Sequence, residues 1–414
     1  MLDNERFFPY PLFVITVDKA EKLVLQTTKN FGVEKVELSD SLQRVLAKPV
    51  HADRDYPPFN RSTMDGIAMR FRAFQKGIRS FEIVSVISAE QMPGDIRNDR
   101  ECVKIMTGAA VPPSCDTIIP VEDLKIEGKN AVVATKSVKK GQFIHVKGVD
   151  KKKSSVVLKA GVLITPEIIP VLASVGQVNV AVSKLPKVAI ITTGDELVDI
   201  DKNPNEYQIR RSNDLAIDAC ISAYKIDAQL FHVEDDKGKI KNIVKKSLQE
   251  FDVVIISGGV SKGEFDYVYK TLESLLVKKI FHGIAQKPGK PMWFGKGKNA
   301  IVFALPGNPV SSFLCVNRYV IPYLKKSLGI LKSNSIDTAV LASDTPANPK
   351  LTLFTQASLE TGKNGRLLAK PIIHNGSGDF ISMVGADVFV ELTPSIKPYK
   401  KSSVCKIWPI KGLL

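Results

Sequence analysis

The chain lacks the cysteine pattern of a disulfide-stapled or zinc-binding protein. It has 414 residues and five cysteines, and no two cysteines form a CxxC pair. An odd number of widely spaced cysteines excludes a disulfide framework and a zinc finger, and it favours a reducing compartment, which we expect to be the cytoplasm. The five histidines are also scattered along the chain, which argues against a His-ligated metal site.

Long apolar runs, repeats and low-complexity tracts are missing as well. No stretch of about 18 uninterrupted apolar residues occurs, so no membrane span is expected. The first residues do not resemble a signal peptide, because Asp3 and Glu5 stand where positive charge is needed. With 44% hydrophobic and 24% charged residues, the composition predicts a soluble globular protein. Its length suffices for about three domains.

Charge is unbalanced toward the positive side. Lys and Arg number 58 against 43 Asp and Glu, a net charge of +15. Such an excess favours anionic partners, whether nucleic acid, acidic membranes or phosphorylated and oxyanionic small molecules. It does not choose among them, and a basic composition without functional meaning is the alternative.

The clearest periodicity lies in residues 185–330, where apolar strand patterns alternate with helical ones. This alternation predicts a doubly wound, mostly parallel sheet covered by helices on both faces. The expected strands are 187–191, 228–233, 252–257, 279–285 and 300–305, and the expected helices are 213–225, 239–251, 265–277 and 310–328.

The flanking segments differ in character. Helical spacing predicts helices over 13–30, 39–47 and 166–176. Short β-prone runs separated by Gly and Pro predict a small all-β module over 51–140 and a second β module over 331–414.

Chemistry-bearing residues follow each strand of the α/β segment. The loops are TTGDEL (192–197), EDD (234–236), SGGVSKGEFD (257–266), KPGKP (287–291) and LPGNPVS (305–311). In an open parallel sheet, ligands bind outside the carboxyl ends of the strands, so we expect these loops to form one crevice.

The residue types in these loops indicate a phosphorylated ligand with a divalent cation. Ser257, Gly258, Gly259 and Ser261 suit a backbone cradle for phosphate, although a turn that needs glycine only for its backbone angles is the alternative. Lys287 and Lys290 provide point charges for an oxyanion. Carboxylates beside a phosphate require a cation such as Mg²⁺, and we expect Glu196 and Asp266, with Asp235, to line it.

The loop over 192–212 is much longer than the ~2–6 residues usual between a strand and a helix. Long loops in compact domains tend to be functional. Arg210 and Arg211 at its end are therefore candidates to reach a phosphate or a neighbouring subunit.

With these residues laid out, the chain resembles the molybdopterin molybdenumtransferase family, known as MoeA in bacteria and as the gephyrin E domain elsewhere. The matching strings occur in family order over residues 7–410. They are NRSTMDGIAMR, KIMTGAAVP, TTGDEL, SGGVSKGEFDY, KPGKP and LPGNPVS.

The resemblance implies an α/β multidomain fold in a homodimer. One elongated linker and dimerisation domain would comprise 7–50 and 141–180, with a β domain of 51–140 inserted in it. Residues 181–330 would form the molybdopterin-binding domain, and 331–414 a β-barrel-like domain.

The resemblance also assigns roles to residues. Asp65, Thr107, Glu196, Asp235 and Asp266 match active-site positions of the family, with Asp65 and Thr107 reaching the site across the dimer. Pro306 and Pro309 also fall on active-site positions, and Lys287, Lys290 and Ser311 match positions associated with molybdate or substrate.

The implied reaction inserts molybdate into adenylylated molybdopterin with release of AMP, and Mg²⁺ is the implied cofactor. Transient contacts with other cofactor-biosynthesis proteins would accompany it. Two alternatives differ in class. A scaffold would keep the fold without the chemistry, and a nucleic-acid binder would show steeply salt-dependent binding, although the chain has no recognised nucleic-acid motif.

Overall fold

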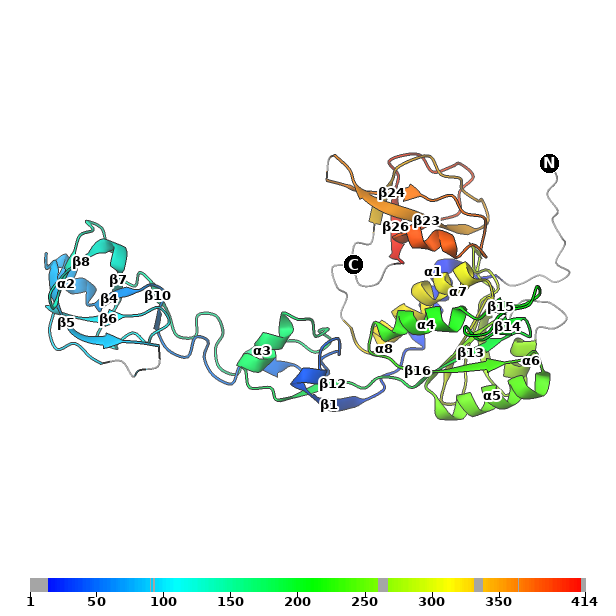
Figure 1. The fold of residues 1–414 in the computed structure, drawn as a ribbon, viewed down its shortest axis with the longest axis horizontal. Helices are drawn as coiled ribbons and strands as arrows, with labels where there is room; N and C mark the ends of the chain where they lie inside the picture. The colour runs from blue at the N-terminus through cyan, green and yellow to red at the C-terminus, as the bar shows by residue number, and fades with distance from the viewer. Residues whose placement is uncertain are drawn as a thin grey trace. The chain divides into compact units, whose positions relative to one another are not determined.

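The computed structural model describes residues 14–410 except 90, 92, 93, 260–266, 331–337 and 364. The chain divides into two compact units (Figure 1). The first takes the chain up to Ala47, the short segment Gly161–Thr165 and everything from Val180 on. The second takes Lys48–Ala160 and Pro166–Asn179.

A six-stranded sheet forms the centre of the first unit. Its spatial order is β16-β13-β17-β21-β20-β18, and the first four strands run parallel. The strands are β13 (Val188–Thr193), β16 (Ala228–Val233), β17 (Val253–Ser257), β18 (Lys278–His282), β20 (Trp293–Lys296) and β21 (Ile301–Leu305). β13, β17 and β21 are buried along their whole length, as their uninterrupted Val and Ile runs require.

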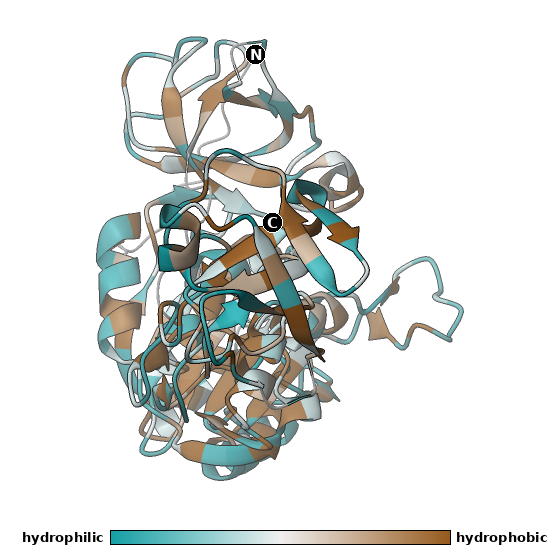
Figure 2. Ribbon diagram, turned by 90° about the vertical axis from the view of Figure 1, so that its left-hand side faces the viewer, coloured by the Kyte–Doolittle hydropathy of each residue, from teal (hydrophilic) through white to brown (hydrophobic). Residues whose placement is uncertain are grey.

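Helices cover both faces of this sheet, which confirms the predicted doubly wound α/β fold. Alternate side chains of β13 point to opposite cores: Ile190 packs with one group of helices and Ile191 with the other. On the first face lie α1 (Val17–Gln26), α4 (Asn213–Ser222), α7 (Pro309–Cys315), η3 (Val316–Val320) and α8 (Ile321–Ser327). On the second lie α5 (Lys237–Glu250) and α6 (Tyr267–Ser274). Figure 2 shows hydrophobic segments along the strands and hydrophilic ones on many of the loops.

The C-terminal part of the first unit is a closed five-stranded barrel, in agreement with the expected barrel-like module. Neighbouring strands follow the order β23-β24-β22-β26-β25, and β25 pairs again with β23. The strands are β22 (Thr338–Leu341), β23 (Thr352–Thr361), β24 (Leu367–Pro371), β25 (Val388–Leu392) and β26 (Val404–Pro409). The short β19 (Gln286–Lys287) pairs in parallel with the first residues of β23 and so ties the barrel to the loop that follows β18.

A buried guanidinium joins the helices to the barrel. Arg318 in η3 is fully buried and contacts Glu21 of α1 at 2.9 Å and Glu391 of β25 at 3.2 Å. Its guanidinium carbon also lies 4.0 Å from the ring centroid of Trp408. A buried cation needs such partners, because an unpaired charge in the interior is very costly.

The predicted helix over 39–47 is wrong. Only a short turn, η1 (Leu38–Asp40), is helical there. Val45 and Leu46 instead form β-bridges with Leu163 and Val182, and both are buried. Pairing with distant segments outweighs the weak local helix preference of this stretch.

The predicted strands and helices of the α/β segment otherwise appear, with two differences. The strand β20 was not predicted, and it runs antiparallel to both of its neighbours. The helix expected over 310–328 is continuous in direction but contains a π-helical stretch, η3, just before Pro322. Proline has no N–H to donate, and a π-helical turn accommodates the lost bond.

Shorter elements complete the first unit. They include two two-stranded pairs: β1 (Val33–Glu37) with β12 (Asn179–Ser183), and β14 (Leu197–Val198) with β15 (Ile209–Arg210). Among the described residues, no helix is long and apolar enough to cross a membrane.

The second unit is built on a curled sheet of order β7-β4-β6-β5-β9-β8, as the β-rich pattern of 51–140 predicts. Its strands are β4 (Gly66–Met69), β5 (Ser80–Ile87), β6 (Glu101–Ile105), β7 (Thr117–Pro120), β8 (Leu124–Glu127) and β9 (Asn130–Val133). The remaining elements of the second unit are β2 (Val50–His51), β3 (Arg61–Ser62), α2 (Phe71–Gln75), η2 (Val121–Asp123), β10 (Ile144–His145), β11 (Val156–Leu158) and α3 (Ile168–Ser174). In the first unit, the short helix η4 (Ile381–Gly385) lies between β24 and β25 in the sequence.

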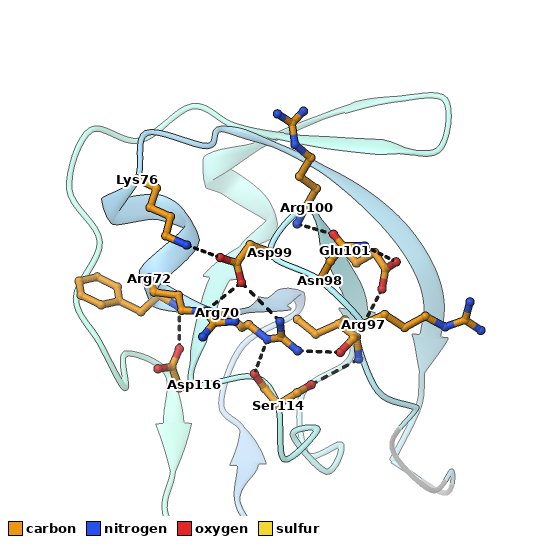
Figure 3. A network of polar contacts seen from close by, with 12 residues as sticks. Arg70, Arg72, Lys76, Arg97, Asn98, Asp99, Arg100, Glu101, Ser114 and Asp116 are labelled. Carbon is orange, nitrogen blue, oxygen red and sulfur yellow. Dashed lines mark hydrogen bonds and ion pairs between the residues drawn. The ribbon is translucent and has the colours of Figure 1, made fainter.

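One carboxylate organises three cations at an edge of the second unit (Figure 3). Asp99 accepts from Arg72 at 2.8 Å and from Lys76 at 2.9 Å, and Arg70 lies 3.4 Å away. Hydrogen bonds from these cations lower the pKa of Asp99 to about 2. The pKa of Asp99 is lower in the folded protein than in the unfolded chain, where it is near 3.8, so ionised Asp99 stabilises the fold at pH values above 3.8. This contribution is lost as the pH falls toward 2.

Gly66 offers a test of the curled sheet. It lies in β4 between β6 and β7, and a Cβ at this position would collide with the main-chain carbonyl of Ile119. We expect Gly66→Ala to destabilise the protein by about 3 kcal/mol or more, because the strands cannot separate without losing their hydrogen bonds. Urea unfolding monitored by circular dichroism measures this. Gly378→Ala, where a Cβ meets open space, is the control, and equal stability of the two variants would contradict the prediction.

Candidate active site at the carboxyl edge of the central sheet

A cleft of about 470 Å³ opens at the carboxyl ends of the parallel strands. All five expected loops contribute to its wall. Four of them follow β13, β16, β17 and β21, and the fifth, KPGKP, contributes Pro291. The lining residues are Thr192, Thr193, Glu196, Leu197, Ile209, Arg210, Arg211, Ser212, Asn213, Asp235, Ser257, Gly258, Gly259, Pro291, Pro306, Gly307, Asn308 and Pro309. The predicted crevice therefore exists.

Two of the predicted carboxylates, Glu196 and Asp235, line this cleft. Glu196 folds back over Gly194, where a Cβ would lie 2.5 Å from its Oε2 atom, so the glycine leaves room for the carboxylate. The N–H of Asp235 donates to Oδ1 of Asp195 at 2.9 Å, which links the loops after β13 and β16. The cleft thus has an acidic side.

Gly258 and Gly259 line the cleft beside Ser257 and cannot carry side chains in this backbone. Both have positive φ, +101° and +63°. A Cβ on Gly258 would come within 2.7 Å of the carbonyl oxygen of Thr193, and one on Gly259 within 2.7 Å of Val268 Cγ2. The glycines therefore allow close packing of this loop against β13 and α6, while Ser261 lies outside the described residues.

Asn213 is a central residue that the sequence did not single out. It begins α4, and its Nδ2 donates to Ser257 Oγ at 2.9 Å and to the carbonyl of Gly307 at 2.7 Å. One side chain thereby connects the ends of the loops that follow β13, β17 and β21. Its only sequence signal was its position directly after the long loop.

Arg210 and Arg211 supply positive charge to the cleft, as their place at the end of the long loop suggested. Arg210 donates from Nε to the carbonyl of Lys202 at 3.0 Å, and Arg211 lies 3.2 Å from Asp199 and 3.5 Å from the buried Asp214. Both arginines are therefore held by the loop that they close.

Lys287, Lys290 and Ser311 do not line this cleft, although Pro306 and Pro309 do. Lys287 is exposed on β19 and Lys290 is half-buried, and the two flank the turn that leads to Pro291. Ser311 lies in α7 and is buried. Asp266, the other predicted magnesium ligand, falls outside the described residues.

Asp65 and Thr107 belong to the second unit and contact each other. The N–H and hydroxyl of Thr107 donate to Asp65 Oδ1 at 2.6 and 2.8 Å. These hydrogen bonds lower the pKa of Asp65, so it remains a carboxylate at neutral pH. The two motifs NRSTMDGIAMR and KIMTGAAVP are thus joined at their polar residues.

The donors of the cleft suit magnesium only in the company of a phosphorylated substrate. Among the described residues, no group of three or more His, Cys, Asp or Glu side chains could hold a metal ion. Mg²⁺ typically takes one or two carboxylates and completes its six ligands with waters and substrate phosphates. Glu196 and Asp235 fit this pattern.

Known protein families match three segments that together cover most of the chain. Residues 15–176 match the MoeA N-terminal region (domains I and II), 189–326 match a probable molybdopterin binding domain, and 338–410 match the MoeA C-terminal region (domain IV). The molybdopterin molybdenumtransferase of Synechocystis is 34% identical over 92% of this chain and 95% of its own, and that of Bacillus subtilis is 30% identical over 96% and 94%.

A solved structure gives the same answer. The chain is similar to the crystal structure of the molybdopterin biosynthesis MoeA protein from Pyrococcus horikoshii OT3. The TM-score is 0.83 at 28% identity, over 96% of this chain and all of the other. A molybdopterin-binding α/β domain with flanking β modules is therefore the class that the fold and cleft define.

Within that class, the chain belongs to the molybdopterin molybdenumtransferase (MoeA) family. It is an enzyme of molybdenum cofactor biosynthesis.

Asn213 provides a test of how the cleft is held. Asn213→Ala removes two hydrogen bonds that fix the loops after β17 and β21. We expect up to about thirty-fold weaker binding of molybdopterin, since the two lost bonds are worth roughly 1 kcal/mol each. Pterin fluorescence titration measures the dissociation constant. Asn242→Ala on the exposed side of α5 is the control, and equal affinity of both variants would refute the role of Asn213.

Proposed function

We propose that this enzyme inserts molybdate into adenylylated molybdopterin, with cleavage of the phosphoanhydride and release of AMP. The observation that carries the proposal is the composition of one cleft. It combines a glycine loop (Ser257, Gly258, Gly259), two arginines and two carboxylates at the carboxyl edge of a parallel sheet. Backbone N–H groups and arginines attract phosphates, and carboxylates attract the divalent cation that phosphates bring.

Glu196 and Asp235 would hold the magnesium ion, with Asp266 as a further ligand. The ion would neutralise charge that develops on the phosphoanhydride. The protein's own contribution is to orient the substrate and to place fixed dipoles around it, which requires no nucleophilic side chain. Lys287, Lys290 and Ser311 would collect the molybdate, and Pro306 and Pro309 would shape the wall of the cleft.

Glu196→Gln tests the role of the carboxylate. The amide keeps the size of the side chain but removes its charge, so magnesium binds more weakly. We expect AMP release from adenylylated molybdopterin to fall about 100-fold at limiting Mg²⁺ and to recover partly at high Mg²⁺. Chromatography of the released AMP measures the rate.

Glu206→Gln is the matched control, because Glu206 lies in the same long loop but not in the cleft. An unchanged rate and an unchanged magnesium requirement in Glu196→Gln would contradict the proposed role. Failure of the wild-type protein to release AMP would contradict the reaction itself.

We further propose a homodimer in which Asp65 and Thr107 of one subunit complete the site of the other. The described cleft is lined by residues of the first unit alone, whereas Asp65 is an exposed, hydrogen-bonded carboxylate of the second unit. Both belong to motifs that match the family along the same chain. A symmetric dimer would supply two such composite sites.

Complementation tests this arrangement. At limiting Mg²⁺, Asp65→Asn and Glu196→Gln are each expected to keep only about 1% of the wild-type rate when tested alone. In a re-equilibrated equal mixture, about half of the dimers are mixed and each carries one intact site, so about a quarter of the wild-type rate returns. If each site were built from one chain, no activity would return. Sedimentation analysis confirms that subunits have exchanged.

A further inference from the structure

The turn that carries Lys287 and Lys290 rests on a buried polar network that lies outside the cleft. Gln286 is fully buried, and its Nε2 donates to the carbonyl of Pro288 at 3.0 Å. Its Oε1 accepts from the hydroxyl of Tyr319 at 2.5 Å, and Tyr319 is 1% exposed. Both ends of the Gln286 amide are therefore used, one by the turn and one by a helix.

The turn also packs directly against that helix. Gly289 has φ of +90°, and a Cβ on it would lie 2.6 Å from Gln286 Nε2 and 2.9 Å from Cys315 Sγ. The thiol of Cys315 points toward the carbonyl of Gly289 at 3.9 Å. No side chain fits between the turn and the helix, so their separation is set by the groups already there.

The helix in contact with the turn carries further predicted site residues. Ser311 and Cys315 are four residues apart in α7 and share one face of it. Pro309, at the beginning of the same helix, lines the cleft. Tyr319 follows in η3. A shift of the turn along the helix would therefore change the distance between the lysines and Ser311.

We propose that Gln286, held by Tyr319, is a positioning residue that sets the geometry of an oxyanion subsite between the lysine turn and α7. The proposal rests on the function proposed above, in which Lys287, Lys290 and Ser311 collect the molybdate. Gln286 and Tyr319 do not touch the substrate. They fix the spacing of the groups that do, because a tetrahedral oxyanion is bound well only by donors at matched distances.

Tyr319 is suited to act as a permanent donor. Burial raises the pKa of its hydroxyl well above the usual value, so the phenol stays neutral throughout the physiological range. The neutral amide of Gln286 can donate to the turn and accept from the phenol at once, which neither a carboxylate nor an ammonium can do. The network therefore holds its geometry independently of pH.

The test compares Tyr319→Phe with wild-type enzyme. The variant removes one oxygen and leaves Gln286 Oε1 buried without its donor, which is costly because the buried carbonyl keeps its desolvation penalty. We expect the dissociation constant for molybdate, measured by equilibrium dialysis, to rise about ten-fold. The KM for molybdate should rise in parallel. The kcat at saturating molybdate and the KM for adenylylated molybdopterin should change by less than about two-fold.

Tyr323→Phe is the matched control, since Tyr323 lies one turn further along and is equally buried, and no hydrogen bond joins its hydroxyl to Gln286 among the described residues. It should leave all of these constants within about two-fold of wild type. Gln286→Met, of similar size but without either hydrogen bond, should weaken molybdate binding at least as much as Tyr319→Phe. Circular dichroism confirms that each variant is folded.

Two results would overturn the proposal. One is a molybdate dissociation constant in Tyr319→Phe that matches wild type. The other is an equal rise in the constants for molybdate and for the pterin, which a general loss of structure would produce. If wild-type protein binds molybdate but releases no AMP, the proposed reaction fails, and the dialysis measurements still decide the role of Gln286.

Discussion

The site depends on the parallel alignment of β13, β16, β17 and β21. Parallel strands place all of their carboxyl ends at one edge, so loops that are far apart in sequence must meet there. That constraint brings Glu196, Asp235 and Gly258 to one cleft although up to 62 residues of sequence separate them. The apolar strands keep the edge rigid because helices bury both faces of the sheet.

The helices on the face of the central sheet opposite α5 and α6 connect the cleft to the rest of the first unit. Of these, α7 and η3 carry Pro309 at the cleft, Tyr319 at the lysine turn, and Arg318 between α1 and the barrel. Arg318 is bonded to carboxylates on two other elements, so the helix cannot slide without exposing an unpaired buried charge. The same helix thus couples the barrel, the turn that carries Lys287 and Lys290, and the cleft.

Sequence reasoning predicted the sheet and the cleft because both follow from local pattern. Runs of Val and Ile identify buried strands, and the loop that follows a parallel strand lies at the carboxyl edge of the sheet, where ligands bind. It failed for 39–47, where Val45 and Leu46 pair with segments more than 100 residues away. It did not single out Asn213 or Gln286, because a single amide side chain adds nothing to the hydrophobic pattern of a strand or helix. The role of such a side chain becomes visible only when the fold brings its hydrogen-bond partners next to it. The placement of Asp65 and Thr107 at the cleft of a partner subunit comes from the family resemblance alone, and it stays a prediction.

The central proposal is that the cleft at the carboxyl edge binds the phosphoanhydride of adenylylated molybdopterin together with Mg²⁺. The most direct measurement is a crystal structure of the full-length protein with AMP and Mg²⁺. We predict the phosphate on Gly258 and Gly259, with the metal ion between it and the carboxylates of Glu196 and Asp235. A nucleotide ordered elsewhere on the protein, with this cleft filled only by water, would contradict the account.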